Sequence, residues 1–379
     1  MNIQSISSNN FKGYDARPLK GFLMSGNPYG IAREMKNIGQ KEGFKIYSLL
    51  NDIECAEGLM HIGYSTNKLW AQDMWTIVKN KLQAFSFNNS TKLIKDFFNL
   101  DTTHMQKNCF DPLQRDHISG GNLFIVNNGI SEELLIGEDE LLRKDVSELL
   151  ETYGVNKVIP IPQMDFHIDL FIRPLDKKRI LLADDKLALD ALKEGKSKLE
   201  KYVATLPPEK QKVYRNIFKN FNREIKEFKK NIKLNKNPKS EDVEKVLERA
   251  GYEVIKVPGR IYNSADIDYE MFLSHICNYI NANAFINEKG DLVYITNKSA
   301  IDDLLGLTPE LSKKIGFSFE DSFIKSIEPY VKREHIYFVE GKEGFVKNFM
   351  LTVNQGGIHC ATMEIPKDVE INEQNSKNR

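Results

Sequence analysis

The fold is indicated first by residues 122–136, which read NLFIVNNGISEELLI. Two apolar runs, 123–126 and 134–136, flank an Asn-Asn-Gly turn sequence, and this pattern predicts a β-hairpin. Apolar residues then recur at helical spacing over 138–153, and 155–162 predicts a further strand. The predicted unit is therefore a hairpin, a helix and a closing strand.

The same order of elements recurs further along the chain. A second hairpin is predicted by 166–174 and 180–182, with its closing strand at 253–258, and a third by 282–286 and 292–296. Units that cannot bury their own apolar faces stack around a centre or in series. The sequence therefore predicts an α/β fold built from repeated ββαβ units.

One segment, 185–242, has no counterpart in the other units. It is rich in Lys and Glu, contains a Pro-Pro break, and carries apolar residues at helical spacing between 214 and 228. We expect inserted helices packed on the rim by this apolar stripe, with docking of a partner or substrate as the alternative. Residues 1–366 are expected to form a single domain, and the polar tail 367–379 to be disordered.

The composition is that of an ordinary globular protein. Across 379 residues, 53 Lys and Arg balance 53 Asp and Glu, which disfavours nucleic acid or an anionic membrane as a partner. The N-terminus has no signal-like apolar core, and no apolar run reaches membrane-spanning length. The four cysteines lie far apart without a C-x-x-C pair, so neither a zinc site nor a disulfide framework is indicated. We expect a soluble protein of a reducing compartment, the cytoplasm, with secretion independent of a signal peptide left open.

The chemistry is concentrated in residues 354–366, which read NQGGIHCATMEIP. The glycine pair that ends at Gly357 lets the backbone turn tightly and lets a ligand approach the chain. Cys360 follows it and is a candidate nucleophile. A thiol is useful only if other groups raise its thiolate fraction and hold a substrate against it.

The candidate acid/base group lies in residues 165–172, which read DFHIDLFI. In a strand, His167 and Asp169 would share one face, because side chains alternate between the faces. Both interrupt an apolar run, where buried polar groups cost free energy unless they are paired or used. A catalytic pair, an orienting contact and a surface pair all remain open.

The candidate anchor is Asp73, which lies between aromatic residues in 69–75, LWAQDMW. It is either a desolvated carboxylate that holds a cationic substrate or a helix-cap or turn aspartate. The Ser-Gly-Gly-Asn sequence at 119–122 predicts a simple turn. A thiol, a histidine and two carboxylates suit attack on a planar cation with several N–H donors, and guanidinium fits that description.

In this order, the motifs resemble the guanidine-modifying enzymes, which include arginine and agmatine deiminases, dimethylarginine hydrolases, amidinotransferases and protein-arginine deiminases. The motifs are Trp-x-Gln-Asp ending at Asp73, Gly-Asn-Leu at 121–123, His-x-Asp at 167–169 and Gly-x-x-Cys ending at Cys360, with His359 just before the cysteine. The resemblance implies a five-bladed α/β-propeller, the pentein fold, with a helical insertion. Trp-Ala-Gln-Asp and the long insertion are most similar to the catalytic domain of protein-arginine deiminases. The cysteine loop is at least as similar to agmatine deiminases.

The resemblance implies a hydrolase acting on C–N bonds of amidines, which converts arginine in proteins or peptides to citrulline and ammonia through a covalent thiouronium. The residues it implies are, for catalysis, Cys360, His167, Asp169 and Asp73 and, for substrate binding, Asp73, Asp169, Trp70 and Gly357.

Two departures from the family pattern bear on cofactor and substrate. Calcium-dependent members carry carboxylates just after the Gln-Asp pair, whereas Met74 and Thr76 stand here, so we expect neither calcium nor another cofactor. Small-molecule deiminases usually carry Glu before the Gly-Gly pair, whereas Ser119 stands here, which favours a protein substrate. The alternatives are a deiminase of agmatine or free arginine and a catalytically inactive propeller that serves as a binding module.

Overall fold

The strands form five three-stranded sheets in the part of the chain that the structure describes. In each sheet, the middle strand is antiparallel to one neighbour and parallel to the other. A parallel pair needs a crossover connection, so this pattern is what ββαβ units produce. The structure is a computed structural model, and the residues that it describes are 18–24, 31–48, 75–78, 81–84, 102–105, 120–128, 130–142, 145–165, 167–234, 240–259, 278–340, 357–367, 369 and 371.

The sheets, each in spatial strand order, are β15 (Thr362–Pro366), β1 (Leu19–Met24) and β2 (Lys45–Ser48); β3 (Trp75–Val78), β4 (Lys81–Ala84) and β5 (Thr102–Met105); β6 (Leu123–Asn127), β7 (Glu132–Gly137) and β8 (Lys157–Ile161); β9 (Ile172–Pro174), β10 (Arg179–Asp184) and β11 (Glu253–Pro258); and β12 (Asn283–Ile286), β13 (Leu292–Asn297) and β14 (Ile336–Val339). The helices and helical turns are α1 (Ile31–Glu42), η3 (Gly120–Asn122), α5 (Glu138–Leu141), α6 (Val146–Tyr153), η4 (Ile168–Leu170), α7 (Asp185–Ala204), α8 (Pro208–Gln211), η5 (Lys212–Tyr214), α9 (Arg215–Leu234), α10 (Ser240–Arg249), α12 (Ile301–Leu305), α13 (Pro309–Ile315), α14 (Phe319–Ile327), η7 (Arg333–His335) and α16 (Ile358–Ala361).

Strand β6 explains why the hairpin sequence is apolar on both faces. Phe124 belongs to the large hydrophobic cluster of the protein, whereas Leu123 and Ile125 belong to a smaller cluster beneath α6. Alternate side chains of a strand point to opposite faces, so a strand covered on both sides is a continuous apolar run.

Helix α6 is capped by Asp145, whose carboxylate accepts a hydrogen bond from the Ser147 amide.

The first and third predicted hairpins are confirmed as β6–β7 and β12–β13. The second differs, because the strand predicted over 166–174 begins only at Ile172. Residues Ile168–Leu170 instead form the helical turn η4. The Ile168 amide donates to Asn122 Oδ1 at 3.0 Å and Asn278 Nδ2 donates to the Leu170 carbonyl at 2.9 Å, so buried asparagine side chains satisfy the backbone of the turn.

The end of the chain closes the sheet that contains its beginning. Strand β15 pairs antiparallel with β1, and Phe22 of β1 lies opposite Glu364 of β15. Because the Cys360 turn directly precedes β15, this pairing ties the candidate nucleophile to the first sheet. The closure of all five sheets into one propeller stays a prediction.

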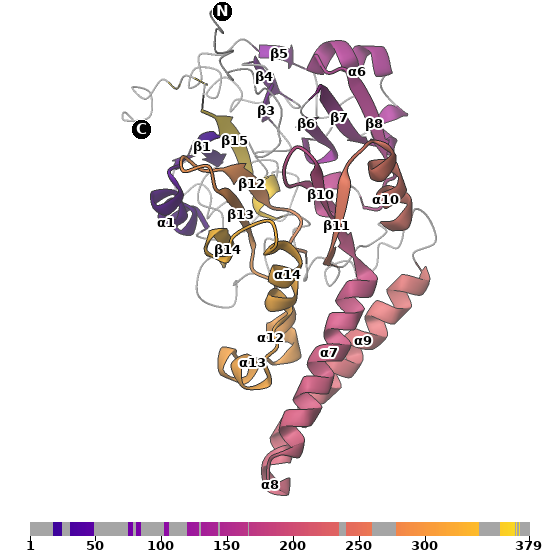
Figure 1. Ribbon diagram of the computed structural model, residues 1–379, viewed down its shortest axis with the longest axis vertical. Helices are drawn as coiled ribbons and strands as arrows, with labels where there is room; N and C mark the ends of the chain where they lie inside the picture. The colour runs from indigo at the N-terminus through magenta and orange to yellow at the C-terminus, as the bar shows by residue number, and fades with distance from the viewer. Residues whose placement is uncertain are drawn as a thin grey trace, which may run out of the picture.

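The expected inserted helices are observed between β10 and β11. Figure 1 shows α7 and α9 side by side, extending away from the sheets with α8 at their far tip. Phe221 and Phe228 of α9 are fully buried and share a cluster with Leu192 and Leu199 of α7. Packing of this apolar stripe explains why the two long helices lie together. The domain boundaries themselves stay a prediction.

None of the helices in the described ranges combines the length and the apolar character that a membrane span requires.

Candidate active site

The backbone that carries Cys360 is anchored by its neighbours in α16. Ile358 and Ala361 are buried in a cluster with Phe22 and Phe285, whose rings meet edge to face at 5.7 Å. Cys360 itself is only 2% exposed. Burial of its two neighbours therefore fixes the direction in which the thiol points.

Asn281 holds the cysteine from two sides. Its Nδ2 group donates to Cys360 Sγ at 3.0 Å, and its Oδ1 accepts from the Cys360 backbone amide at 3.1 Å. Asn281 is 1% exposed. An amide donor aimed at sulfur favours the thiolate over the thiol, because hydrogen bonding to the charged form stabilises it.

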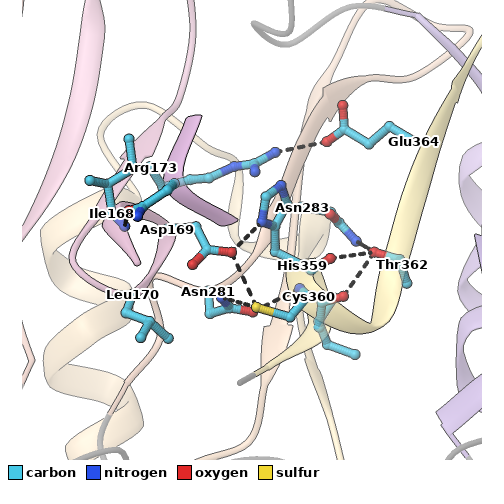
Figure 2. Close-up of polar contacts among 12 residues, drawn as sticks. Ile168, Asp169, Leu170, Arg173, Asn281, Asn283, His359, Cys360, Thr362 and Glu364 are labelled. Carbon is cyan, nitrogen blue, oxygen red and sulfur yellow. Dashed lines mark hydrogen bonds and ion pairs between the residues drawn. The ribbon is translucent and has the colours of Figure 1, made fainter. Parts of the chain in front are cut away.

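Asp169 is the buried carboxylate of the site. Its Oδ2 lies 2.8 Å from His359 Nδ1 and accepts from the Cys360 thiol at 3.2 Å, as Figure 2 shows. Burial raises the pKa of Asp169, but the hydrogen bond with His359, the charges of His359 and His167 and the thiol together hold it below the usual aspartate value. Asp169 is therefore ionised at neutral pH.

His167 completes the group. One donor atom from each of His167, Asp169 and Cys360 lies within 4.8 Å of the other two. The sequence predicted that His167 and Asp169 would share the face of a strand, which is wrong, because His167 precedes the helical turn η4. The turn nevertheless brings both side chains to the cysteine.

The other predicted site residues have different outcomes. Asp73 and Trp70 lie outside the described residues, and so does Ser119. Gly357 precedes α16, and a Cβ atom at this position would lie 2.5 Å from Asn297 Oδ1 and 2.8 Å from Asn281 Oδ1. The close approach of the backbone to these two amides explains why glycine stands there.

The sequence-based prediction assigned no catalytic or binding role to two residues of the site. Asn281 and His359 both contact the Cys360–Asp169 pair. A signal for the polar site was present, because asparagines recur at 278, 281, 283 and 297, among apolar residues that precede or form strands β12 and β13. Buried amides in such a run indicate a polar centre that the strands surround.

The donor set of the group also suits a metal ion. Thiolate, imidazole and carboxylate are the ligands that Zn²⁺ prefers. Asp169 Oδ2 is already shared between His359 and Cys360, whereas its Oδ1 is buried without a hydrogen-bond partner in the described part of the chain. Among the described residues, Asp169 Oδ1 is therefore a buried carboxylate oxygen available to a cation, whether a metal or an organic group.

No protein-family model matches the chain, and no curated protein matches it. Solved structures do match the chain. C. jejuni agmatine deiminase is similar with a TM-score of 0.49 and 15% identity, over 95% of this chain and 97% of that one. A mutant of the DDAH from Pseudomonas aeruginosa, complexed with citrulline, has a TM-score of 0.42 and 10% identity, over 92% and 99%. At these values the likeness carries no argument about activity, which rests on the residues of this chain.

Proposed function

We propose that this chain is a cysteine hydrolase that deiminates a guanidino group and releases ammonia. The observation that carries the proposal is the contact between the Cys360 thiol and the buried, ionised Asp169, with His167 in the same group. A nucleophile, a proton carrier and a carboxylate within reach of one another are what attack on a guanidinium requires.

A cationic substrate would balance the negative charges of the Asp169 carboxylate and the Cys360 thiolate. A carboxylate beside a thiolate disfavours the thiolate, because like charges repel in a buried site. A guanidinium bound between them removes that cost, and its N–H groups match the open Oδ1 of Asp169. Asp73 stays a second expected carboxylate for the same cation.

The reaction proceeds in two halves. The Cys360 thiolate adds to the guanidinium carbon, His167 gives a proton to one nitrogen, and the C–N bond breaks to release ammonia and leave a thiouronium. Neutral His167 then takes a proton from water, hydroxide adds to the same carbon, and the C–S bond breaks. Loss of one further proton leaves the ureido product and restores the thiolate.

Burial of the site favours a small substrate over an arginine in a folded protein. Cys360 is 2% exposed, and Asp169 and His359 are 0% exposed. A closed site of this kind would take agmatine or free arginine whole, whereas an arginine of a folded protein would need an open cleft. The second candidate, deimination of arginine in proteins, is favoured by the long helices α7 and α9, which offer a docking surface.

The five sheets support a closed five-bladed propeller around this site. Each has the same strand pattern, and β15 completes the sheet that β1 begins. The last strand thereby covers the edge that β1 would otherwise leave unpaired. A closed ring would explain how residues far apart in sequence converge at Cys360.

A ureido-product assay tests the proposal. Purified protein is offered agmatine, free arginine and an arginine-containing peptide in parallel, with added calcium and with a calcium chelator, beside a Cys360→Ala control. Product from agmatine or arginine, absent in the control and unaffected by calcium, is expected. Product from the peptide alone would favour the second candidate. No product from any substrate, with Cys360 also inert toward a haloacetamidine, would leave the inactive binding module as the better explanation.

A further inference from the structure

A buried ion pair joins the two segments that carry the candidate catalytic groups. Arg173 Nη2 lies 2.8 Å from Glu364 Oε1, and the two side chains are 2% and 1% exposed. The partners are separated by 191 residues in the sequence. Arg173 lies in β9 and Glu364 in β15, so the pair spans two different sheets.

The pair repeats the contact between Asp169 and Cys360 four residues further along each segment. Each segment is a short helical turn followed by a strand. Asp169 and Cys360 lie on the two turns, and Arg173 and Glu364 lie on the two strands. Figure 2 shows both cross-links between the same two stretches of chain. The two turns are joined by the contacts of Asp169 with Cys360 and His359, and the ion pair joins the two strands. Contacts at both places define the register of one segment against the other, which contacts at the turns alone do not.

Stability alone does not explain this pair. Desolvation of two buried charges offsets most of their attraction, and apolar residues of similar volume commonly replace such pairs without loss. Moreover, Nε and Nη1 of Arg173 have no hydrogen-bond partner among the described residues, which adds to the cost. What such a pair does provide is a fixed orientation of the two segments that carry its charges.

The guanidinium of Arg173 also lies over the ring of Phe124, which borders the candidate site. Its Cζ lies 5.4 Å from the centre of the Phe124 ring, and the same ring lies 5.4 Å from the His359 ring. His359 in turn contacts Asp169. Arg173 therefore packs on Phe124, which packs in turn on the histidine that bonds the Asp169 carboxylate.

We propose that Arg173 and Glu364 are positioning residues, which set the register of η4–β9 against α16–β15 and thereby hold Asp169 against Cys360. The role in turnover rests on the proposed deiminase function, whereas the role in placing the thiol does not.

The test compares Arg173→Met/Glu364→Leu with wild type and with Lys193→Met/Asp190→Leu. The control removes an exposed pair on α7 in which Lys193 Nζ lies 2.7 Å from Asp190 Oδ1. Circular dichroism and thermal melts establish that each variant is folded, and all rates are measured well below the melting temperature. Arg173→Met alone serves as a second variant, because it leaves Glu364 unpaired and should melt at a lower temperature than the double variant.

Two readouts separate positioning from a structural role. The double variant is expected to lose about tenfold or more in kcat with little change in KM, because a small misplacement of reacting groups has that effect. Its Cys360 alkylation rate with iodoacetamide, followed on the Cys360 peptide by mass spectrometry, should differ from wild type by about threefold or more. The control pair should change neither.

A double variant with wild-type kcat overturns the proposal where wild type is active. If wild type shows no turnover, the proposed deiminase function has failed. The alkylation rate of Cys360 then decides by itself whether Arg173 and Glu364 position the thiol. An unchanged rate at Cys360 then overturns the positioning role, and a changed rate supports it.

Discussion

Asn281 contacts Cys360 through both ends of its side-chain amide, with Nδ2 on the sulfur at 3.0 Å and Oδ1 on the backbone amide at 3.1 Å. The two contacts fix the position of the candidate nucleophile and favour its charged form at once. A single residue from a distant loop thereby supplies part of what the thiol needs to react.

Asn281→Leu should lower kcat/KM by about tenfold to a hundredfold, the range expected when a hydrogen bond to a charged group is lost. The thiolate population at neutral pH should fall, so Cys360 alkylation should reach its maximum at higher pH. Alkylation rates across a pH series measure this. Asn283→Leu is the matched control, since Asn283 Nδ2 bonds Thr362 Oγ1 at 2.8 Å and not the sulfur. Equal effects of the two changes would contradict the role of Asn281.

Gly357→Ala should displace the cysteine turn. The added methyl group would lie 2.5 Å from Asn297 Oδ1 and 2.8 Å from Asn281 Oδ1, closer than real contacts allow. We expect activity to fall by at least about tenfold, because the Asn281 contacts to Cys360 shift. Gly316→Ala is a control for backbone strain alone, because Gly316 has a φ of 65° and open space around it. It should lower the melting temperature and leave kcat unchanged.

His359→Phe should move the acid limb of the kcat/KM profile to higher pH. His359 lowers the pKa of Asp169, against the effect of burial, so wild type keeps the carboxylate ionised into the acid range. Without Nδ1 the pKa rises, and activity is lost at a higher pH as the solution is acidified. The stability contributed by the ionised carboxylate is likewise lost as pH falls through its folded pKa. His359→Asn, which restores a donor near Nδ1, should return the profile toward wild type.

Glu320→Gln should stabilise the protein above neutral pH. Burial, followed by the charge of Asp302, raises the pKa of Glu320 to about 7, and its Oε1 has no hydrogen-bond partner among the described residues. A raised carboxyl pKa favours the folded state below the unfolded value and loses that contribution as pH rises through about 7. The effect is on the order of 2 kcal/mol. Urea unfolding at pH 5 and pH 8 should show a smaller difference for the variant than for wild type.

Zinc should bind at the group of His167, Asp169 and Cys360 and inhibit the proposed activity. His167, Asp169 and Cys360 offer donor atoms within 4.8 Å of one another, and all three suit Zn²⁺. Micromolar zinc should raise the melting temperature of wild type by mass action and abolish turnover, and a chelator should reverse both effects. Cys360→Ser should lose the stabilisation. If that variant gains as much as wild type, zinc binds elsewhere.

The sequence by itself determined the repeating unit. The hairpins at 122–136 and 282–296 follow from apolar runs and turn residues that lie a few positions apart, so local chemistry specifies them. The same reasoning singled out Cys360 as a thiol after a glycine pair and His167 with Asp169 as polar interruptions in an apolar run. These signals are local, and the structure places all three residues together.

Only the tertiary structure decided how these residues meet. The segment at 168–170 is a helical turn because Asn122 and Asn278 bond its backbone, and neither is near it in sequence. Asn281 and His359 reach Cys360 and Asp169 across 79 and 190 residues. Side-chain amides and imidazoles carry no local pattern that names their partners. Their contacts are set by the packing of separate sheets, whose geometry arises from burial over the whole chain.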